Sequence, residues 1–120
     1  MKRYFINLYE YEFWANNKIL TYMESDTPSK NVIDNFSHMV ADMKPWAMLL
    51  NKESVPDNIE CLPSWNIQQC REALEDVSAR INSLISSFES TDFENKVSSA
   101  GRNGQEFTNT VIEVLTQIVT

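Results

Sequence analysis

Glycine is nearly missing from this 120-residue chain, and that shortage constrains its fold more than any other feature. The chain has 2 glycines, where average usage of roughly 7% predicts about eight. Both of them, Gly101 and Gly104, lie in one short stretch. Folds with many tight turns, and loops that cradle phosphates, need more glycine, so dinucleotide-binding and P-loop folds are excluded. Long helices with few tight turns are favoured.

Size and charge narrow the class of protein further. A chain of 120 residues makes one domain, residues 1–120. Its 10 Lys and Arg against 17 Asp and Glu give a net charge of −7, which disfavours nucleic acid as a partner. No apolar run reaches the ~18 residues of a membrane span. Glu10 and Glu12 interrupt the N-terminal apolar stretch, so it does not resemble a signal peptide. We therefore expect a cytoplasmic protein without a membrane partner.

The spacing of apolar residues predicts two helices in the first half of the chain. The first runs from Arg3 to Glu24, uninterrupted by Gly or Pro. The second runs from Pro28 to Leu50, with Thr27 as its N-cap. Pro45 lies inside the second helix, where it removes a backbone hydrogen bond and predicts a kink or a break near Asp42. The face of the first helix that we expect to be buried carries Tyr4, Leu8, Tyr11, Ala15, Ile19 and Tyr22, and it is widened by Phe5, Trp14 and Met23.

Two more helices are predicted in the second half. Ile67–Glu89 has the most regular apolar spacing, and Asn66 and Gln69 are placed to cap it reciprocally. Residues 91–109 lose the helical period and are expected to form a loop, with a short hairpin turning at Asn103-Gly104. The last helix, Val111–Thr120, begins with the capping-box pair Thr110 and Glu113.

The four helices together predict an all-α fold, an up-down four-helix bundle. The last helix is short beside partners of ~20 residues, so we interpret it as truncated and the chain as a segment of a longer protein. The residues that we expect to be largely buried are Leu8, Ala15, Phe36, Val40, Leu74, Val77, Ile81 and Leu115.

The sole histidine, His38, is the most suggestive candidate for a functional residue. Asp34 and Asp42 lie four residues before and after it, in line on one helix. His38 lies about 160° around the predicted helix from its apolar residues, which are Phe36, Val40 and Met43. One interpretation is a metal ligand or a catalytic imidazole oriented by a carboxylate. The other is a solvated histidine beside two surface carboxylates, because one histidine does not make a zinc site that needs three or four ligands.

Three segments resemble, in the right order, the DinB/YfiT-like family of four-helix-bundle proteins. The first is Tyr11–Leu20, with a Trp-Ala-Asn run beginning at Trp14. The second is Phe36–Trp46, where His38 is followed by an Ala-Asp pair and then by Trp46. The third is Thr110–Thr120, which resembles the stretch leading into the family's His-x-x-x-His pair.

The resemblance implies a divalent metal ion, Zn or Ni, held by three histidines. One of them maps onto His38, and the other two would fall just beyond Thr120. The metal is therefore expected only in the complete parent, with none bound to this chain. Asp34 and Asp42 would orient His38 from the second shell of ligands. Trp14, Trp46 and Gln117 would line the substrate cleft.

The function that the resemblance implies is a metal-dependent reaction on a small-molecule substrate, of thiol transferase or hydrolase type. Two alternatives of other classes stay open. One is a non-catalytic, stress-associated bundle that binds a small ligand and has lost the metal. The other is an interaction module that forms a homodimer. The catalytic residues are not identified, and whether the chain is an enzyme stays open.

Overall fold

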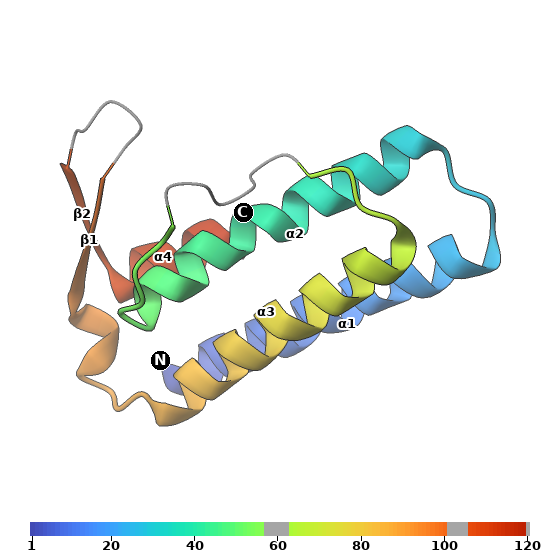
Figure 1. The fold of residues 1–120 in the computed structure, drawn as a ribbon. Helices are drawn as coiled ribbons and strands as arrows, with labels where there is room; N and C mark the ends of the chain where they lie inside the picture. The colour runs from blue at the N-terminus through green and yellow to red at the C-terminus, as the bar shows by residue number, and fades with distance from the viewer. Residues whose placement is uncertain (57–62, 101–105, 120) are drawn as a thin grey trace.

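The computed structural model describes residues 1–56, 63–100 and 106–119. It is mostly helical, and its helices are α1 (Lys2–Ser25), α2 (Lys30–Leu50), α3 (Ile67–Ser87) and α4 (Val111–Val119). A 3-10 turn, η1 (Asp92–Glu94), and two strands, β1 (Lys96–Ala100) and β2 (Glu106–Thr110), lie between α3 and α4. Figure 1 shows the long helices side by side, with the two strands at one end. The predicted class, four helices in a mostly helical fold, is confirmed.

The directions of the helices differ from a strict up-down order. α2 runs opposite to α1, but α3 runs parallel to α2 (Figure 1). Ser37 lies beside Cys70 near the N-terminal ends of α2 and α3, and Glu53, just after α2, pairs with Arg80 near the other end of α3. An up-down bundle needs a short connection at each end. Here Ser64, shortly before α3, lies beside Asp34 in the first turns of α2, so α3 begins at the same end of the bundle as α2.

The start of α2 differs from the sequence prediction, and the predicted break near Asp42 does not occur, whereas the predicted kink stays a prediction. The N-cap is Ser29 and not Thr27, and the Ser29 hydroxyl oxygen accepts a hydrogen bond from the Val32 N–H at 3.4 Å. The helix continues through Pro45 to Leu50 without ending and restarting. Pro45 removes a single N–H, and the buried side chains around it hold this part of α2 against its neighbours.

The two predicted capping boxes are confirmed. The Gln69 side chain accepts from the Asn66 N–H at 2.9 Å, and the Asn66 side chain accepts from the Gln69 N–H at 2.8 Å. At α4, Glu113 Oε1 accepts from the Thr110 N–H at 3.1 Å, and Thr110 Oγ1 accepts from the Glu113 N–H at 3.2 Å. Each pair satisfies two N–H groups that a helix start leaves unpaired. α3 ends at Ser87, two residues before the predicted end.

The predicted hairpin is present as an antiparallel pair of strands. Lys96 pairs with Thr110 at one end of the ladder, and Ala100 pairs with Glu106 at the other. The predicted turn at Asn103-Gly104 lies outside the described residues. The Val111 N–H donates to the Asn95 carbonyl at 2.8 Å. The hairpin therefore leads directly into α4 and fixes where that helix begins.

The buried face of α1 is not the one that the spacing favoured. Tyr4, Tyr11 and Tyr22 are exposed to 62%, 65% and 65%. The buried face lies about 100–150° further around the helix and carries Phe5, Tyr9, Phe13, Asn16, Leu20 and Met23. Of the predicted residues, Phe5 and Met23 are therefore confirmed as buried. Because α1 has large apolar side chains on more than one side, periodicity alone does not select its inner face. The ring of Phe5 stacks on that of Phe93 at 5.7 Å, which helps to set the rotation of α1.

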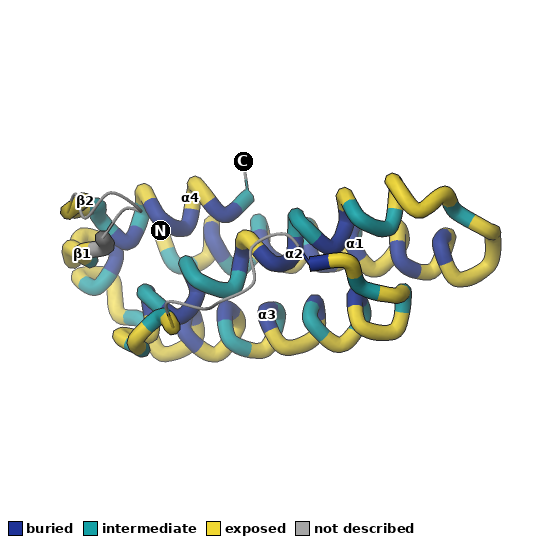
Figure 2. Tube along the Cα trace, turned by 45° about the horizontal axis from the view of Figure 1, so that its top comes forward, coloured by how far each residue is buried: buried dark blue, intermediate teal, exposed yellow. Residues whose placement is uncertain are grey.

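The other helices bury the faces that the sequence predicted. Buried residues lie where the helices face one another, and α3 is exposed along its outer side (Figure 2). The expected core is confirmed at Phe36, Val40, Leu74, Val77, Ile81 and Leu115. Leu8 and Ala15 are only partly buried, because of the rotation of α1. Among the described residues, no helix combines the length and the apolar character that crossing a membrane requires.

Candidate ligand-binding cleft

A cleft of about 310 Å³ lies where α2, β2 and α4 meet. The hairpin leads straight into α4, and the Thr110–Glu113 cap ties the two together, so the end of β2 lies beside the first turns of α4. α2 closes the other side. The cleft is lined by Trp46, Phe107, Asn109, Val114 and Gln117.

The lining of this cleft combines apolar walls with a few side-chain amides. Trp46 is partly buried and packs against the core, while Phe107 remains 47% exposed. Asn109 donates from Nδ2 to Glu113 Oε2 at 3.4 Å, and Gln117 contributes a second amide. Ligand sites are typically mainly apolar, with a small number of placed polar groups, and have volumes of about 300–1,000 Å³. The cleft suits a small molecule with an apolar body and one polar end.

Two of the three predicted cleft residues, Trp46 and Gln117, are brought together here. The other lining residues, Phe107, Asn109 and Val114, were not predicted as part of a site. Phe107 and Asn109 lie in the predicted loop and hairpin, residues 91–109, for which the sequence predicts no neighbours elsewhere in the fold. The signal that would have found them is the position of a hairpin directly before a capped helix, which places the last strand beside that helix.

Trp14 does not line this cleft. Its side chain is 57% exposed on the outer side of α1, 6.0 Å from the Tyr11 ring between centroids. The ammonium group of Lys18 lies 5.7 Å from the centre of the Trp14 ring, in a cation–π contact. The neighbours of Trp14 therefore belong to α1 itself.

His38 and Asp42 lie on α2, eight and four residues before Trp46. These spacings place Asp42 about 6 Å and His38 about 12 Å along the helix axis from Trp46. His38 is partly buried and Asp42 is exposed. α4 runs antiparallel to α2, with Val111 near Leu50 and Val114 near Trp46. Its direction therefore leads from the cleft toward Asp42 and His38.

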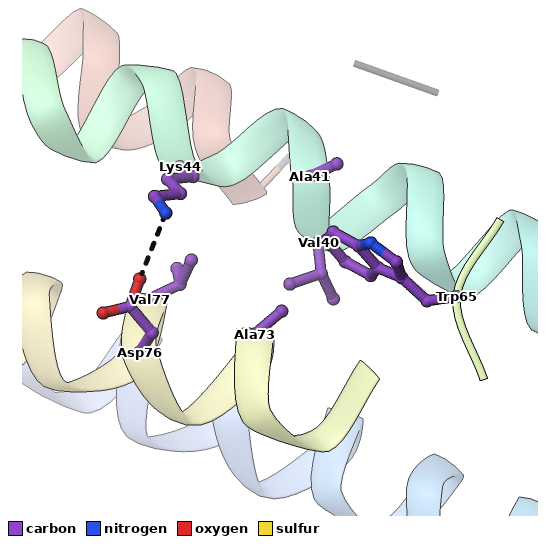
Figure 3. Close-up of a pocket in the computed structure, with 7 residues that line it drawn as sticks. All are labelled: Val40, Ala41, Lys44, Trp65, Ala73, Asp76 and Val77. Carbon is purple, nitrogen blue, oxygen red and sulfur yellow. Dashed lines mark ion pairs between the residues drawn. The ribbon is translucent and has the colours of Figure 1, made fainter. Parts of the chain in front are cut away.

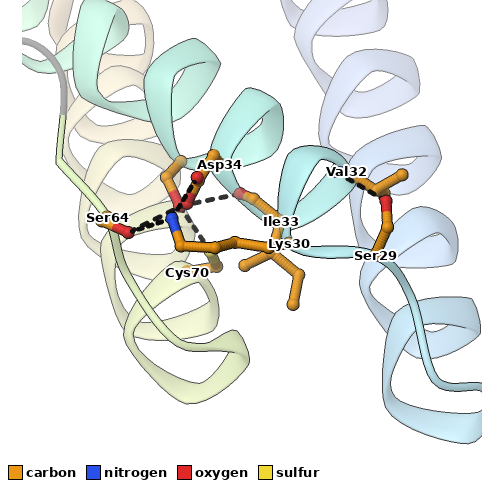
Figure 4. A network of polar contacts seen from close by, with 8 residues as sticks. Ser29, Lys30, Val32, Ile33, Asp34, Ser64 and Cys70 are labelled. Atoms are coloured by element: carbon orange, nitrogen blue, oxygen red, sulfur yellow. Dashed lines mark hydrogen bonds and ion pairs between the residues drawn. The ribbon is translucent and has the colours of Figure 1, made fainter.

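The carboxylate of Asp34 is held by residues other than His38. Lys30 Nζ lies 2.6 Å from Asp34 Oδ2, and the Ser64 hydroxyl donates to Asp34 Oδ1 at 3.0 Å (Figure 4). The hydrogen bond from Lys30 is the main reason that the pKa of Asp34 is lowered, and His38 adds a small electrostatic contribution. Asp34 therefore ties the start of α2 to the segment before α3. Its role as an orienting partner of His38 stays a prediction.

The described residues do not make the metal site that the resemblance implies. Among them, no group of three or more His, Cys, Asp or Glu side chains is placed to hold a metal ion. On α2, His38 and the exposed Asp42 offer one imidazole and one carboxylate, and Asp34 is engaged by Lys30 and Ser64. A zinc site in a protein needs three or four ligands.

A second hollow, of about 170 Å³, lies between α2 and α3 (Figure 3). Val40, Ala73 and Trp65 form its apolar part. At its other end Lys44 Nζ lies 3.9 Å from Asp76 Oδ2, and Asp76 also pairs with Arg80 on its own helix. The charged groups at this end already have partners, and none of the predicted site residues lies here. The cleft beside Trp46 is therefore the better candidate.

The fold and the cleft define a small helical-bundle protein with a ligand-sized cleft between its second and fourth helices. Comparisons with protein-family models, with curated proteins and with solved structures find no match to this chain. The function is therefore argued from the residues themselves.

Proposed function

We propose that this protein is a DinB/YfiT-like helical bundle that binds a small molecule in the cleft between α2, β2 and α4. One observation carries the proposal. Trp46 and Gln117, which the sequence suggested as cleft residues, line the same hollow although they are far apart in the chain. Small-molecule sites in bundles lie between neighbouring helices, as this one does.

The chemistry of the lining suggests what would bind. The rings of Trp46 and Phe107 offer flat apolar surface to an aromatic or aliphatic body. The amides of Asn109 and Gln117 offer both donors and acceptors to a neutral polar group. The 310 Å³ volume is at the low end for ligand sites, which favours a compact ligand.

A fluorescent apolar probe tests this proposal. We expect the neutral dye N-phenyl-1-naphthylamine to bind the 120-residue protein, with energy transfer from tryptophan. Phe107→Ala and Trp46→Ala should each weaken binding about tenfold, because each removes one aromatic wall. Val32→Ala is the matched control, since Val32 is also 47% exposed but lies at the start of α2, away from the cleft. Equal affinity in Phe107→Ala, Trp46→Ala and the control would reject the cleft as the site.

A second candidate function is metal-dependent transfer or hydrolysis, with His38 as one ligand of a divalent metal. The direction of α4, from the cleft toward Asp42 and His38, favours it. The further ligands would have to come from residues outside the described part of the chain. The substrate would then occupy the cleft beside Trp46.

Metal content tests this second candidate. In the longest form that the gene encodes, we expect about one Zn or Ni per chain by elemental analysis, and loss of most of it in His38→Ala. Asn35→Ala, a neighbouring exposed position on α2, is the control. Equal metal content in the three proteins would leave His38 as a surface histidine.

A further inference from the structure

The outer side of α1 carries most of the exposed large hydrophobic side chains among the described residues. Of eight such side chains, five belong to this one helix. Four of the five are aromatic, and they are Tyr4, Tyr11, Trp14 and Tyr22, each between 57% and 65% exposed. Tyrosine and tryptophan are the residues most enriched at protein–protein interfaces, because they bury much area and keep a polar handle.

This aromatic face points away from the other helices of the bundle. The side of α1 that faces α3 is marked by two contacts, from Lys2 Nζ to the Ser86 carbonyl and from Arg71 Nε to Glu24 Oε1. The aromatic face, which we define as Tyr4, Tyr11, Trp14 and Tyr22, is rotated by about 80–180° from those contacts. Its described ring contacts are made within α1 itself, by Tyr4 with Phe5, by Tyr11 with Trp14 and by Lys18 with Trp14.

Tyr4, Tyr11 and Trp14 of this face are spaced like the positions of a coiled-coil seam, and Tyr22 lies one residue beyond such a position. Tyr4, Tyr11 and Lys18 follow one another at intervals of seven residues, and Asn7 and Trp14 fill the alternate positions. Such a seven-residue pattern lets two helices pack along their whole length. α1 has 24 residues, so the seam is about 36 Å long.

We propose that a second copy of this chain packs on the aromatic face, with the two α1 helices antiparallel about a two-fold axis. The axis passes between Tyr11 and Trp14, so Tyr11 faces Trp14 of the partner subunit, and the reverse. The same register sets Asn7 against the partner's Lys18. A two-fold interface uses the same patch on both subunits, as this pairing does.

α1 has no net charge, although the whole chain is strongly negative, so two α1 helices repel each other less than two whole chains would. The chain has a net charge of −7, which opposes association of two copies. α1 carries Lys2, Arg3 and Lys18 against Glu10, Glu12 and Glu24, so its net charge is zero. Glu24 is in addition paired with Arg71 of α3 within the same subunit. The aromatic face is thus a surface that a second negative copy can approach without strong repulsion.

The area of the face is sufficient for a weak, specific dimer. A fully covered aromatic side chain buries about 150–250 Å². At about 60% exposure, the four aromatic side chains would bury roughly 400–600 Å² on each subunit. Both subunits together reach about 800–1,200 Å² from these rings alone, and the side chains between them add to that. Stable interfaces begin near about 1,200 Å² in total.

Sedimentation equilibrium of the 120-residue protein tests the proposal. We expect a reversible dimer, and we expect Trp14→Ser to raise its dissociation constant at least about tenfold, because each dimer loses two aromatic contacts. Val32→Ser, an exposed hydrophobic residue on α2, should leave the constant unchanged. Both substitutions are at exposed sites, so circular dichroism should show unchanged helicity in each.

The register of the two α1 helices is tested by introducing a negative or a positive side chain at Asn7. Asn7→Glu sets a carboxylate against the partner's Lys18 and should tighten the dimer about two- to tenfold, whereas Asn7→Lys should weaken it by a similar factor. Parallel α1 helices would instead place position 7 opposite itself, and both substitutions would then weaken the dimer. A monomer at all concentrations overturns the proposal, as does a dimer that Trp14→Ser leaves unchanged.

Discussion

The Tyr9 hydroxyl donates a hydrogen bond of 2.6 Å to the backbone carbonyl of Leu115. Both residues are 0% exposed. The bond links the first helix to the last, across most of the length of the sequence. It fixes the position of α4 against α1, and through α4 it fixes one wall of the cleft. The chemistry of the cleft therefore depends on a residue of α1 that does not line it.

Removing this hydroxyl should loosen α4. We expect Tyr9→Phe to lower the free energy of unfolding by about 0.5–1.5 kcal/mol, the usual net contribution of one hydrogen bond. Urea denaturation followed by circular dichroism measures the change. Tyr4→Phe, at an exposed position of the same helix, should change stability by less than about 0.5 kcal/mol. The prediction fails when the two variants unfold alike.

Tyr9 should also make the fold sensitive to alkaline pH. Burial raises the pKa of Tyr9 above its ordinary value of 10.0, and the nearby charge of Glu12 adds to the rise. The folded state therefore keeps the proton at a pH where the unfolded state releases it. The resulting contribution to stability is complete below about pH 10 and is lost as the pH rises beyond that value. Urea midpoints from pH 8 to pH 11 should fall more steeply in the wild type than in Tyr9→Phe, and parallel curves would contradict this.

The buried apolar side chains of α3 should contribute a large share of the free energy of unfolding. Leu74 is 1% exposed at the centre of the core. Leu74→Ala should therefore cost about 2–5 kcal/mol, as buried leucine truncations do. Glu75→Ala, the next residue and an exposed one, serves as the control and should stay within about 0.5 kcal/mol of the wild type. Chemical denaturation measures both, and a negligible cost at Leu74 would mean that α3 does not face the core.

Cys70 should be inert to alkylation in the folded protein. Its side chain is 0% exposed, and its thiol lies 3.3 Å from the Ser37 hydroxyl, within hydrogen-bond distance. Burial raises the pKa of the Cys70 thiol, with a smaller opposing effect from Ser37, so little of the reactive thiolate forms near pH 8. In a Cys61→Ser background, iodoacetamide should modify Cys70 at least about 100-fold more slowly in buffer than in urea. Mass spectrometry measures both rates, and equal rates would show that Cys70 is accessible.

The start of α4 should depend on its capping pair. Thr110→Ala removes the hydroxyl that accepts from the Glu113 N–H, and it should cost about 0.5–2 kcal/mol. Thr110→Ser keeps a hydroxyl at the same position and should recover most of that loss. Because the cap positions the end of β2, Thr110→Ala should also weaken binding of the fluorescent probe to the cleft. Equal stability of the alanine and serine variants would argue against the cap.

The sequence by itself determined the local features of this protein. Scarce glycine and the three-and-four spacing of apolar residues predicted four helices. The pairs Asn66–Gln69 and Thr110–Glu113 predicted where α3 and α4 begin, and both pairs form as expected. These features depend on neighbours within a turn or two of the helix, so the sequence specifies them directly. The buried face of α3 followed in the same way, because that helix has one apolar stripe.

The tertiary structure decided which face of α1 is buried, because that helix has large apolar side chains on several sides. Contacts such as Phe5 with Phe93 and Tyr9 with Leu115 join residues far apart in the chain, and no local pattern contains them. The same holds for the cleft. The sequence suggested Trp46 and Gln117, but only the packing of β2 and α4 against α2 brought Phe107 and Asn109 beside them and left Trp14 on the opposite side of α1 from the core. Helix spacing fixes which residues share a face, whereas the choice among competing faces is made by how well they pack against the rest of the chain.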